Sequence, residues 1–378
     1  MAAALQQSDL ASEFGSPDAR VRDEAWRYSK TALRALSQQE FVIADGAAEV
    51  SSALRERFAW PQTNGRRVVF VNGVFSAAHS DFDATNGAVE VRPAAPDRYT
   101  IATSSDAELL HVVYLGIPGA TASRWSAALD IDVTTGGVHL IEQHLSDAGT
   151  DVLGALMSTI RVGARGELRH TLIIEAAESA SLYRRTQSRV ESDAMLRTTH
   201  ALFGGRLQRH DIEVDIAGEH ARYESRGLFA LRGRQHVDTH LEVRHGARDT
   251  ACDIVWRGVA DERARGIFYG AITVAGGADG ADAQLSNKNL LLSPLAEIDT
   301  QPALEIYADE VKAAHGATVG QLDERALFYL RSRGIPAAEA RRMLVGAFST
   351  VALDRIDERW LRDHLAALLA PRVGGDTA

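Results

Sequence analysis

Cysteine is nearly absent from this sequence: Cys252 is the only one among 378 residues. One thiol excludes an intramolecular disulfide framework and any all-cysteine metal cluster held by this chain alone. Lysine is almost as scarce, with only Lys30, Lys288 and Lys312, which leaves few side chains for Schiff-base chemistry. No apolar run approaches the roughly 18 residues of a membrane span, and the first residues lack the basic and apolar regions of a secretory signal. We therefore expect a soluble, cytoplasmic protein.

Positive charge is also in deficit, since 41 basic residues face 51 acidic ones and the net charge is −10. This balance argues against a protein that coats nucleic acid or an anionic membrane, because both need a basic surface. The sequence also lacks the glycine-rich nucleotide loops and the Gly-x-Ser-x-Gly elbow of hydrolases. Cys252 lies in a strand-like run, Asp249-Thr-Ala-Cys-Asp-Ile-Val-Trp, and is interpreted as a small core residue rather than a nucleophile.

The chain is predicted to have four parts. They are a helical and mixed N-terminal region over 1–95, a strand-rich core over 96–318, a helical domain over 319–370 and a disordered tail over 371–378. Helix signals in the first part begin at Ser16–Pro17 and cover 47–58. A β-branched run from Arg67 ends at Asn72–Gly73, a pair typical of tight hairpin turns.

Proline is missing between Pro118 and Pro294, although glycine stays frequent there. Proline cannot donate to a strand ladder, so its absence indicates interior strands. Strand-like runs recur and, from residue 209 on, begin about 10–18 residues apart, which leaves little room for helices between them. They cover 169–175, 209–216, 223–231, 237–245, 252–257, 266–274 and 284–292. This spacing predicts an all-β sandwich, barrel or solenoid, and without a strict repeat it leaves sandwich and solenoid open.

Three amphipathic helices are predicted after the strands, over 321–333, 336–353 and 358–369. Gly334 and Pro336 are typical of a helix end followed directly by a helix start. The apolar faces of these helices fit either a cap on the β core or a docking surface for a partner.

The histidines are the main candidates for metal-binding or catalytic side chains in this sequence. His236, Asp238 and His240 alternate along one predicted strand and share a face, with His245 on the opposite face. His236 and His240 are then roughly 13 Å apart, too far to bind one metal ion. A solvent-facing polar strand is therefore favoured for this trio.

His315 has a different setting. It follows the run Leu304–Val311, which is expected to be the final strand, and Gly316 comes directly after it. This position predicts that His315 lies at the exposed rim of the β core.

Several segments resemble the SufB/SufD family of iron–sulfur cluster assembly proteins. The resemblance is densest from Asn287-Lys-Asn-Leu-Leu-Leu-Ser-Pro to His315-Gly-Ala-Thr, and it continues through Ala326-Leu-Phe-Tyr-Leu-Arg-Ser-Arg-Gly-Ile. The segments His236-Val-Asp-Thr-His, Gly266-Ile-Phe-Tyr-Gly-Ala-Ile-Thr-Val and Glu24-Ala-Trp-Arg-Tyr-Ser are similar to the family's core and N-terminal motifs. The resemblance implies a mainly β fold, a right-handed parallel β-helix over 96–318 flanked by N-terminal and C-terminal α-helical regions.

The resemblance also implies a non-enzymatic scaffold of the Suf machinery. The His315-Gly-Ala-Thr form is similar to the SufD branch of the family. That similarity implies a heterodimer with SufB and docking of the SufC ATPase, in which the ATPase activity would reside. A transient iron–sulfur cluster shared with SufB is implied as cargo, and whether a flavin binds stays open.

The family pattern assigns residues to three roles. His315 matches the family's proposed cluster-site histidine and is the candidate iron ligand. Ala313 and Ala314 replace a frequent Cys-Ser pair, so thiolate ligands would have to come from SufB. The implied edge strand that pairs antiparallel with SufB contains Leu304, Ile306 and Val311. The implied SufC docking residues on the C-terminal helices are Leu327, Phe328, Leu330, Leu344 and Phe348.

Two other functions are compatible with the sequence. A carbohydrate-active β-helix enzyme would need clustered carboxylates, and Asp211, Glu213 and Asp215 alternate along one predicted strand face. A solvated strand explains these acidic residues equally well. The second possibility is a homodimer of this chain acting without SufB, because an open strand edge can pair with any compatible strand.

Overall fold

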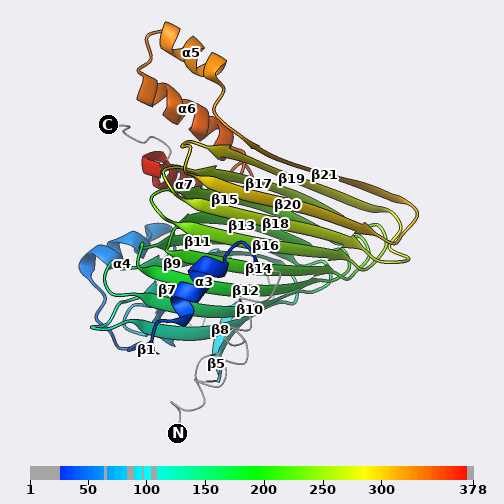
Figure 1. Ribbon diagram of the computed structural model, residues 1–378. Helices are drawn as coiled ribbons and strands as arrows, with labels where there is room; N and C mark the ends of the chain where they lie inside the picture. The colour runs from blue at the N-terminus through cyan, green and yellow to red at the C-terminus, as the bar shows by residue number, and fades with distance from the viewer. Residues whose placement is uncertain (1–25, 64–65, 83–88, 96–97, 104–108, 373–378) are drawn as a thin grey trace.

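The structure is a flattened parallel β-helix with helices attached to it (Figure 1). The computed structural model describes residues 26–63, 66–82, 89–95, 98–103 and 109–372. The chain alternates between two long sheets, which we call sheet A and sheet B, so that each coil adds one parallel strand to each. This arrangement confirms the parallel β-helix and excludes the sandwich that strand spacing alone left open.

Sheet A consists of β5 (Val89–Ala95), β6 (Arg98–Thr103), β8 (Ser123–Val133), β10 (Val152–Val162), β12 (Ala180–Val190), β14 (Leu207–Ile216), β16 (His236–His245), β18 (Arg265–Val274) and β20 (Glu297–Ile306), with β1 (Val42–Ile43) beside β8. Sheet B consists of β3 (Val74–Phe75), β4 (Asp81–Phe82), β2 (Arg66–Val71), β7 (Leu109–Gly116), β9 (Gly137–Ser146), β11 (Glu167–Ala176), β13 (Met195–Gly204), β15 (Arg222–Leu231), β17 (Ala251–Ala260), β19 (Ala281–Leu291) and β21 (Val311–Gly320). The helices are α3 (Lys30–Ser37), α4 (Ser52–Phe58), α5 (Glu324–Ser332), α6 (Ala337–Thr350) and α7 (Arg359–Leu369), with short 3-10 turns η2 (Pro61–Thr63) and η3 (Ala370–Arg372).

Residues in the left-handed conformation mark one corner of successive coils. Arg165, Asp193, His220 and Asp249 have φ angles between 56° and 63° and lie 28, 27 and 29 residues apart. Each donates its N–H to a carbonyl of the next coil, as Asp193 does to Glu219 at 2.9 Å. Because the coil length changes from one coil to the next, the sequence shows no strict repeat.

Apolar columns fill the interior between the two sheets. Leu168, Leu196, Tyr223 and Cys252 occupy paired positions of successive strands in sheet B, and all four are buried in the core. Burial raises the pKa of the Cys252 thiol to about 12, which confirms its interpretation as a core residue. At Gly227 an added Cβ would lie 2.0 Å from the Trp256 ring, so the indole fills the space of the missing side chain.

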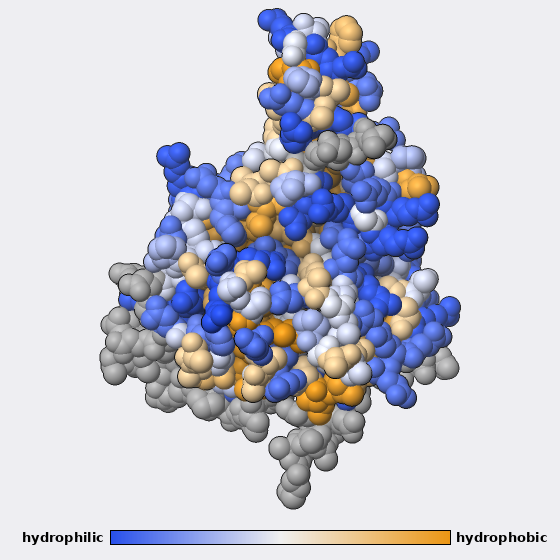
Figure 2. Space-filling model, turned by 90° about the vertical axis from the view of Figure 1, so that its left-hand side faces the viewer, coloured by the Kyte–Doolittle hydropathy of each residue, from blue (hydrophilic) through white to orange (hydrophobic). Residues whose placement is uncertain are grey.

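Helices cover the outer faces of both sheets. Leu361 and Leu365 of α7 are buried against Ile173 and Phe203 on sheet B. On the other side α3 lies across sheet A (Figure 1), where Leu33 is buried in one small cluster with Trp26 and Tyr183. In contrast, α5 and the beginning of α6 project from the body, as Figures 1 and 2 show.

The local predictions outside the core have mixed outcomes. The three C-terminal helices are confirmed as α5, α6 and α7, and the predicted helix over 47–58 is confirmed in its second half as α4. Asn72 and Gly73 make the predicted hairpin turn between β2 and β3, with φ angles of 48° and 81°. The helix start at Ser16–Pro17 and most of the tail over 371–378 lie outside the described residues.

Candidate functional site

The two sheets end together at one end of the β-helix. In the described part of the chain, β20 and β21 each have one neighbouring strand, so each keeps one free edge. Every residue of β21 is exposed or half-buried, whereas the inward-facing residues of β19, one coil below, are buried. The last coil therefore exposes both unpaired backbone groups and the interior row of side chains to solvent.

The predicted final strand over Leu304–Val311 is wrong. Leu304 and Ile306 belong to the end of β20, Val311 begins β21, and the four residues between Ile306 and Val311 form the corner of the coil. This corner stacks on the corner of the preceding coil, where the N–H of Gly280 donates to the carbonyl of Glu310 at 2.7 Å. The stacking fixes the position of the turn. The run Leu304–Val311, which resembles a single strand in the sequence, is therefore divided between β20 and β21.

His315 lies in the middle of β21, rather than after the last strand as predicted. Its backbone pairs with Leu285, which faces the core and is buried, and paired residues of parallel strands share a face. His315 therefore belongs to the inward-facing row, but it is exposed because no further coil covers it. The neighbouring inward positions hold the small residues Ala313 and Ala317, which leave space around the imidazole.

A buried polar group lies directly below this open end. The side-chain oxygen of Asn287 accepts hydrogen bonds from Thr300 at 2.8 Å and from Asn289 at 2.5 Å. Asn289 also donates to the carbonyl of Thr318 in β21 at 3.1 Å. These contacts tie β19 to β20 and to β21. The sequence contains a signal for these contacts, since both asparagines fall in the inward-facing alternation of β19 that Ala281, Ala283 and Leu285 begin.

The described residues contain no group of three or more histidine, cysteine, aspartate or glutamate side chains placed to hold a metal ion. His315 alone can supply one nitrogen ligand at the open end. An iron–sulfur cluster bound there would be a cargo shared with another molecule, because iron needs further ligands.

The predicted SufC docking residues divide into two groups in the structure. Phe328 is 72% exposed on the projecting α5, whereas Leu327 is buried and Leu330 is half-buried. On α6, Leu344 and Phe348 are half-buried, and Phe348 packs against sheet B. Tyr329 and Met343, at 57% and 48% exposure, extend the exposed apolar surface of the α5–α6 projection (Figure 2).

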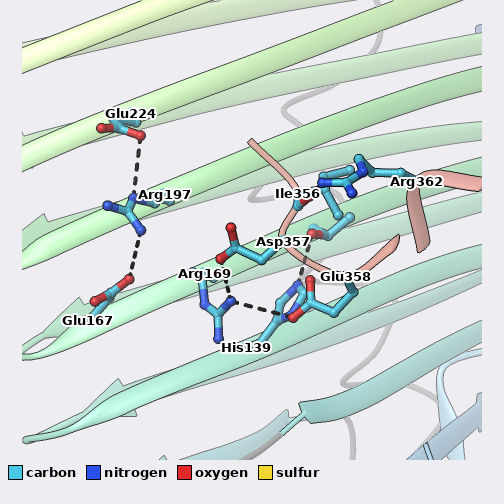
Figure 3. A network of polar contacts seen from close by, with 10 residues as sticks. His139, Glu167, Arg169, Arg197, Glu224, Ile356, Asp357, Glu358 and Arg362 are labelled. Carbon is cyan, nitrogen blue, oxygen red and sulfur yellow. Dashed lines mark hydrogen bonds and ion pairs between the residues drawn. The ribbon is translucent and has the colours of Figure 1, made fainter. Parts of the chain in front are cut away.

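A polar network fastens the segment before α7 to sheet B (Figure 3). Glu358 contacts His139 of β9 at 2.7 Å, and Arg169 of β11 pairs with Asp357 at 2.8 Å and with Glu358 at 3.4 Å. Burial raises the pKa of Glu358, but the hydrogen bond and charge of His139 and the charge of Arg169 lower it more, so the net shift is downward. The network holds α7 as a fixed part of the body.

The prediction of a solvent-facing strand at His236, Asp238 and His240 is wrong. Ser29 lies over this strand, donates to Asp238 at 2.5 Å and contacts Nε2 of His236 at 2.9 Å. Asp238 also binds Arg209 at 2.8 Å. Burial lowers the pKa of His236 to about 4, so its imidazole is neutral near pH 7. The covering residue comes from the N-terminal segment, more than 200 residues earlier, which no local pattern reveals.

The interior holds a charged cluster that the sequence analysis missed. Glu142 of β9 and Arg184 of β12 form a fully buried ion pair, with one N–O contact at 2.8 Å. His144 and His170 bind the two oxygens of Glu142 at 2.8 and 3.1 Å, and Ser158 binds Arg184 at 3.2 Å. Burial lowers the pKa of both histidines, so the cluster contains one cation and one anion.

The acidic row on the outer face of sheet A is paired with arginines. Glu213 binds Arg185 at 2.7 Å, and Asp215 binds Arg189 at 2.6 Å. Asp211 binds Arg209 at 2.6 Å. Carboxylates held in ion pairs of this kind do not support the carbohydrate-active alternative.

Within the described ranges, none of the helices has the length and apolar character that crossing a membrane requires.

The fold and its open end define the class of the protein: a parallel β-helix with helical attachments. A sequence family described as the SUF system FeS cluster assembly SufBD core domain matches residues 131–348. The chain therefore belongs to the SufB/SufD family of iron–sulfur cluster assembly proteins.

Two curated relatives align over nearly the whole chain, and a third aligns over a smaller part of it. The iron-sulfur cluster assembly protein SufD of Escherichia coli is 28% identical over 386 residues, covering 94% of this chain and 89% of its own length. A SufBD family protein of Synechocystis is 27% identical, with coverages of 93% and 87%. The chloroplastic protein ABCI7 of Arabidopsis thaliana is 27% identical and covers 73% of this chain and 61% of its own length.

Proposed function

We propose that this chain is a SufD-like scaffold subunit that pairs with a SufB partner and docks the SufC ATPase. The observation that carries the proposal is the unfinished last coil. Both sheets end there with a free strand edge, and the interior row is exposed at His315. A second β-helix placed on this end would continue both ladders and cover the exposed row.

In this proposal His315 donates an imidazole nitrogen to an iron–sulfur cluster held between the two subunits. Thiolate ligands come from the partner, because the sole cysteine of this chain is buried in the core. The nucleotide chemistry belongs to SufC, whereas this chain positions the cluster and supplies one of its ligands. The deciding experiment is co-expression of this chain with SufB and SufC, followed by mass determination of the complex and assay of its iron and sulfide. A complex that excludes this chain, or one in which it only self-associates, would contradict the proposal.

The free edge of β20 can be tested by replacing Ile306 with proline. The N–H of Glu297 donates to Ala264, directly before β18, and the N–H of Tyr307 donates to Val274 at the end of β18. Odd-numbered residues of β20 therefore direct their N–H toward β18, and even-numbered ones, Ile306 among them, direct it toward the free edge. Ile306→Pro removes one outward donor and obstructs an added strand. We expect SufB pairing to weaken at least about tenfold, roughly 1.4 kcal/mol, as measured by analytical ultracentrifugation.

Glu305→Pro is the matched control for this variant, because it removes an N–H that faces β18. That substitution is expected to lower the melting temperature, whereas Ile306→Pro leaves it nearly unchanged. Unaltered SufB pairing by a folded Ile306→Pro variant would show that the edge of β20 takes no part in the interface.

The docking surface for SufC is assigned to the α5–α6 projection, not to the whole region over 321–369. Phe328→Asp places a charge on a side chain that is 72% exposed, so the fold should be unaffected. Exposed aromatic residues often carry much of the binding energy of an interface. We expect SufC affinity to fall at least about tenfold by isothermal titration calorimetry.

Leu361→Asp is the contrasting variant, because Leu361 of α7 is fully buried against sheet B. It should destabilise the protein by several kcal/mol through an unpaired buried charge. Full SufC affinity in the Phe328→Asp variant would leave α5 without the proposed role.

A further inference from the structure

A groove of about 1010 Å³ runs between α3 and one corner of the β-helix. Its floor contains one residue from each of five successive coils. The strand registers place these residues in a single column, Ser179, Gly205, Arg234, Arg263 and Leu295. With about 4.8 Å between neighbouring strands, the column is about 19 Å long.

Small side chains of α3 build one wall of the groove. Thr31, Ala32 and Ala35 lie on one face of this helix, whereas the rest of the lining includes charged and polar side chains, namely Asp151, Glu178, Arg206, Gln235, His236 and Arg265. On the floor, Gly205 has a φ of +96°, a conformation that L side chains rarely adopt, and it leaves the floor without a side chain at that coil. The groove is therefore open because Gly205 and the alanines of α3 leave the space between them unfilled.

Two arginines in the column have exposed guanidinium groups. Among the described residues, neither the Arg234 nor the Arg263 guanidinium makes a hydrogen bond or an ion pair. By contrast, Arg206 pairs with Asp151 at 2.5 Å, and Arg265 pairs with acidic residues at 3.0 Å. The lining also contains two carboxylates, of which Asp151 is paired with Arg206 and Glu178 makes no ion pair with a described residue. The two unpaired arginines therefore outnumber the one unpaired carboxylate of the lining, and an anion is favoured beside them.

We propose that this groove docks a peptide segment of a partner protein that carries acidic side chains. Arg234 and Arg263 lie on adjacent coils and can each bind a carboxylate in the bidentate geometry that guanidinium favours. Leu295, 61% exposed on the next coil, and the alanines of α3 offer contacts for apolar side chains between the acidic ones. The length of the column and these apolar contacts favour a peptide over a small anion.

The test is fluorescence anisotropy with a labelled peptide of about eight residues in the pattern Glu-Ala-Glu-Leu, which spans about 26 Å when extended. The probe is titrated with the full chain at low and at high salt, beside matched peptides with glutamine or lysine in place of glutamate. We expect binding of the acidic peptide only, weakened several-fold by salt. Arg234→Glu with Arg263→Glu should weaken it at least about tenfold.

The control is Arg161→Glu with Arg222→Glu, two exposed arginines near the opposite corner of the coil that change the net charge equally. If both double variants lost affinity for the acidic peptide equally, net charge alone would explain the binding, and the proposal would be overturned. Displacement of the peptide by inorganic phosphate at equal concentration would identify a small-anion site instead. Binding that emerges only after Asp18→Asn, Asp23→Asn and Glu24→Gln would assign the groove to this chain's own N-terminal segment. Either result would overturn the proposal.

Discussion

Replacing Arg184 with methionine is expected to destabilise the fold by about 3–5 kcal/mol. The substitution leaves the carboxylate of Glu142 buried without its cation, and both side chains are completely shielded from solvent. The free energy of unfolding should be measured by urea denaturation, with the slope checked against wild type. A loss below about 1 kcal/mol would contradict the assignment of Glu142 as a charged, paired group.

The double variant Glu142→Leu with Arg184→Met provides the matched control. Replacing both charges with apolar side chains of similar volume is often close to neutral, because the cost of desolvating the ions disappears with them. We therefore expect the double variant to regain most of the stability lost in Arg184→Met. A double variant as unstable as the single one would show that the cavity, rather than the unpaired charge, causes the loss.

The same cluster predicts how stability depends on pH. Burial lowers the pKa of His144 and His170, so unfolding exposes imidazoles that bind protons more readily. Their contribution to stability is present above about pH 6.5 and is lost as the pH falls below it. The pKa of Glu142 is held well below its usual range, since Arg184 and the two histidines outweigh burial, and its contribution is lost only at more acidic pH. Urea denaturation between pH 7.5 and about pH 5 should show the first loss.

His315→Ala is expected to abolish most cluster formation while leaving the fold intact. The side chain is exposed in the last inward row, so its removal should change the free energy of unfolding by less than about 0.5 kcal/mol. Loss of the proposed iron ligand should lower the iron and sulfide content of the complex reconstituted with SufB and SufC at least about tenfold. Acid-labile sulfide and visible absorption measure the cluster, and thermal unfolding measures the fold.

His220→Asn is the matched control for this variant. His220 is also exposed but lies at a coil corner with a φ of 60°, which asparagine tolerates. Its cluster content should equal that of wild type. Normal cluster content in the His315→Ala complex would remove His315 from the site, and this subunit would then supply no ligand of its own.

Local features of the fold were predictable because their causes are local. Asn72 and Gly73 adopt the positive φ angles of a tight turn, and asparagine and glycine tolerate them at any place in a chain. Gly334, which follows the C-terminal end of α5, has a φ of +86°, a value typical of the residue after a helix end. The absence of proline between residues 118 and 294 likewise followed from the need of each strand for ladder donors.

The features that sequence reasoning missed depend on distant parts of the chain. His236 is buried because Ser29 covers it, and the two residues are 207 positions apart. His315 lies inside a strand because the corner of the preceding coil fixes where the last coil turns. Glu142 and Arg184 meet across the interior from two different sheets, 42 residues apart. The SufB/SufD resemblance identified the family and the β-helix, but it did not supply these contacts.

The open last coil also bears on how long a single copy of this chain survives. A pair of free edges over an exposed apolar row is a template for any extended polypeptide, including another copy of this chain or one that is still folding. In the proposed complex with SufB, an excess of this subunit would therefore be removed by aggregation or by proteolysis. Matched synthesis of the two proposed subunits, rather than their affinity alone, would then determine how much complex a cell accumulates.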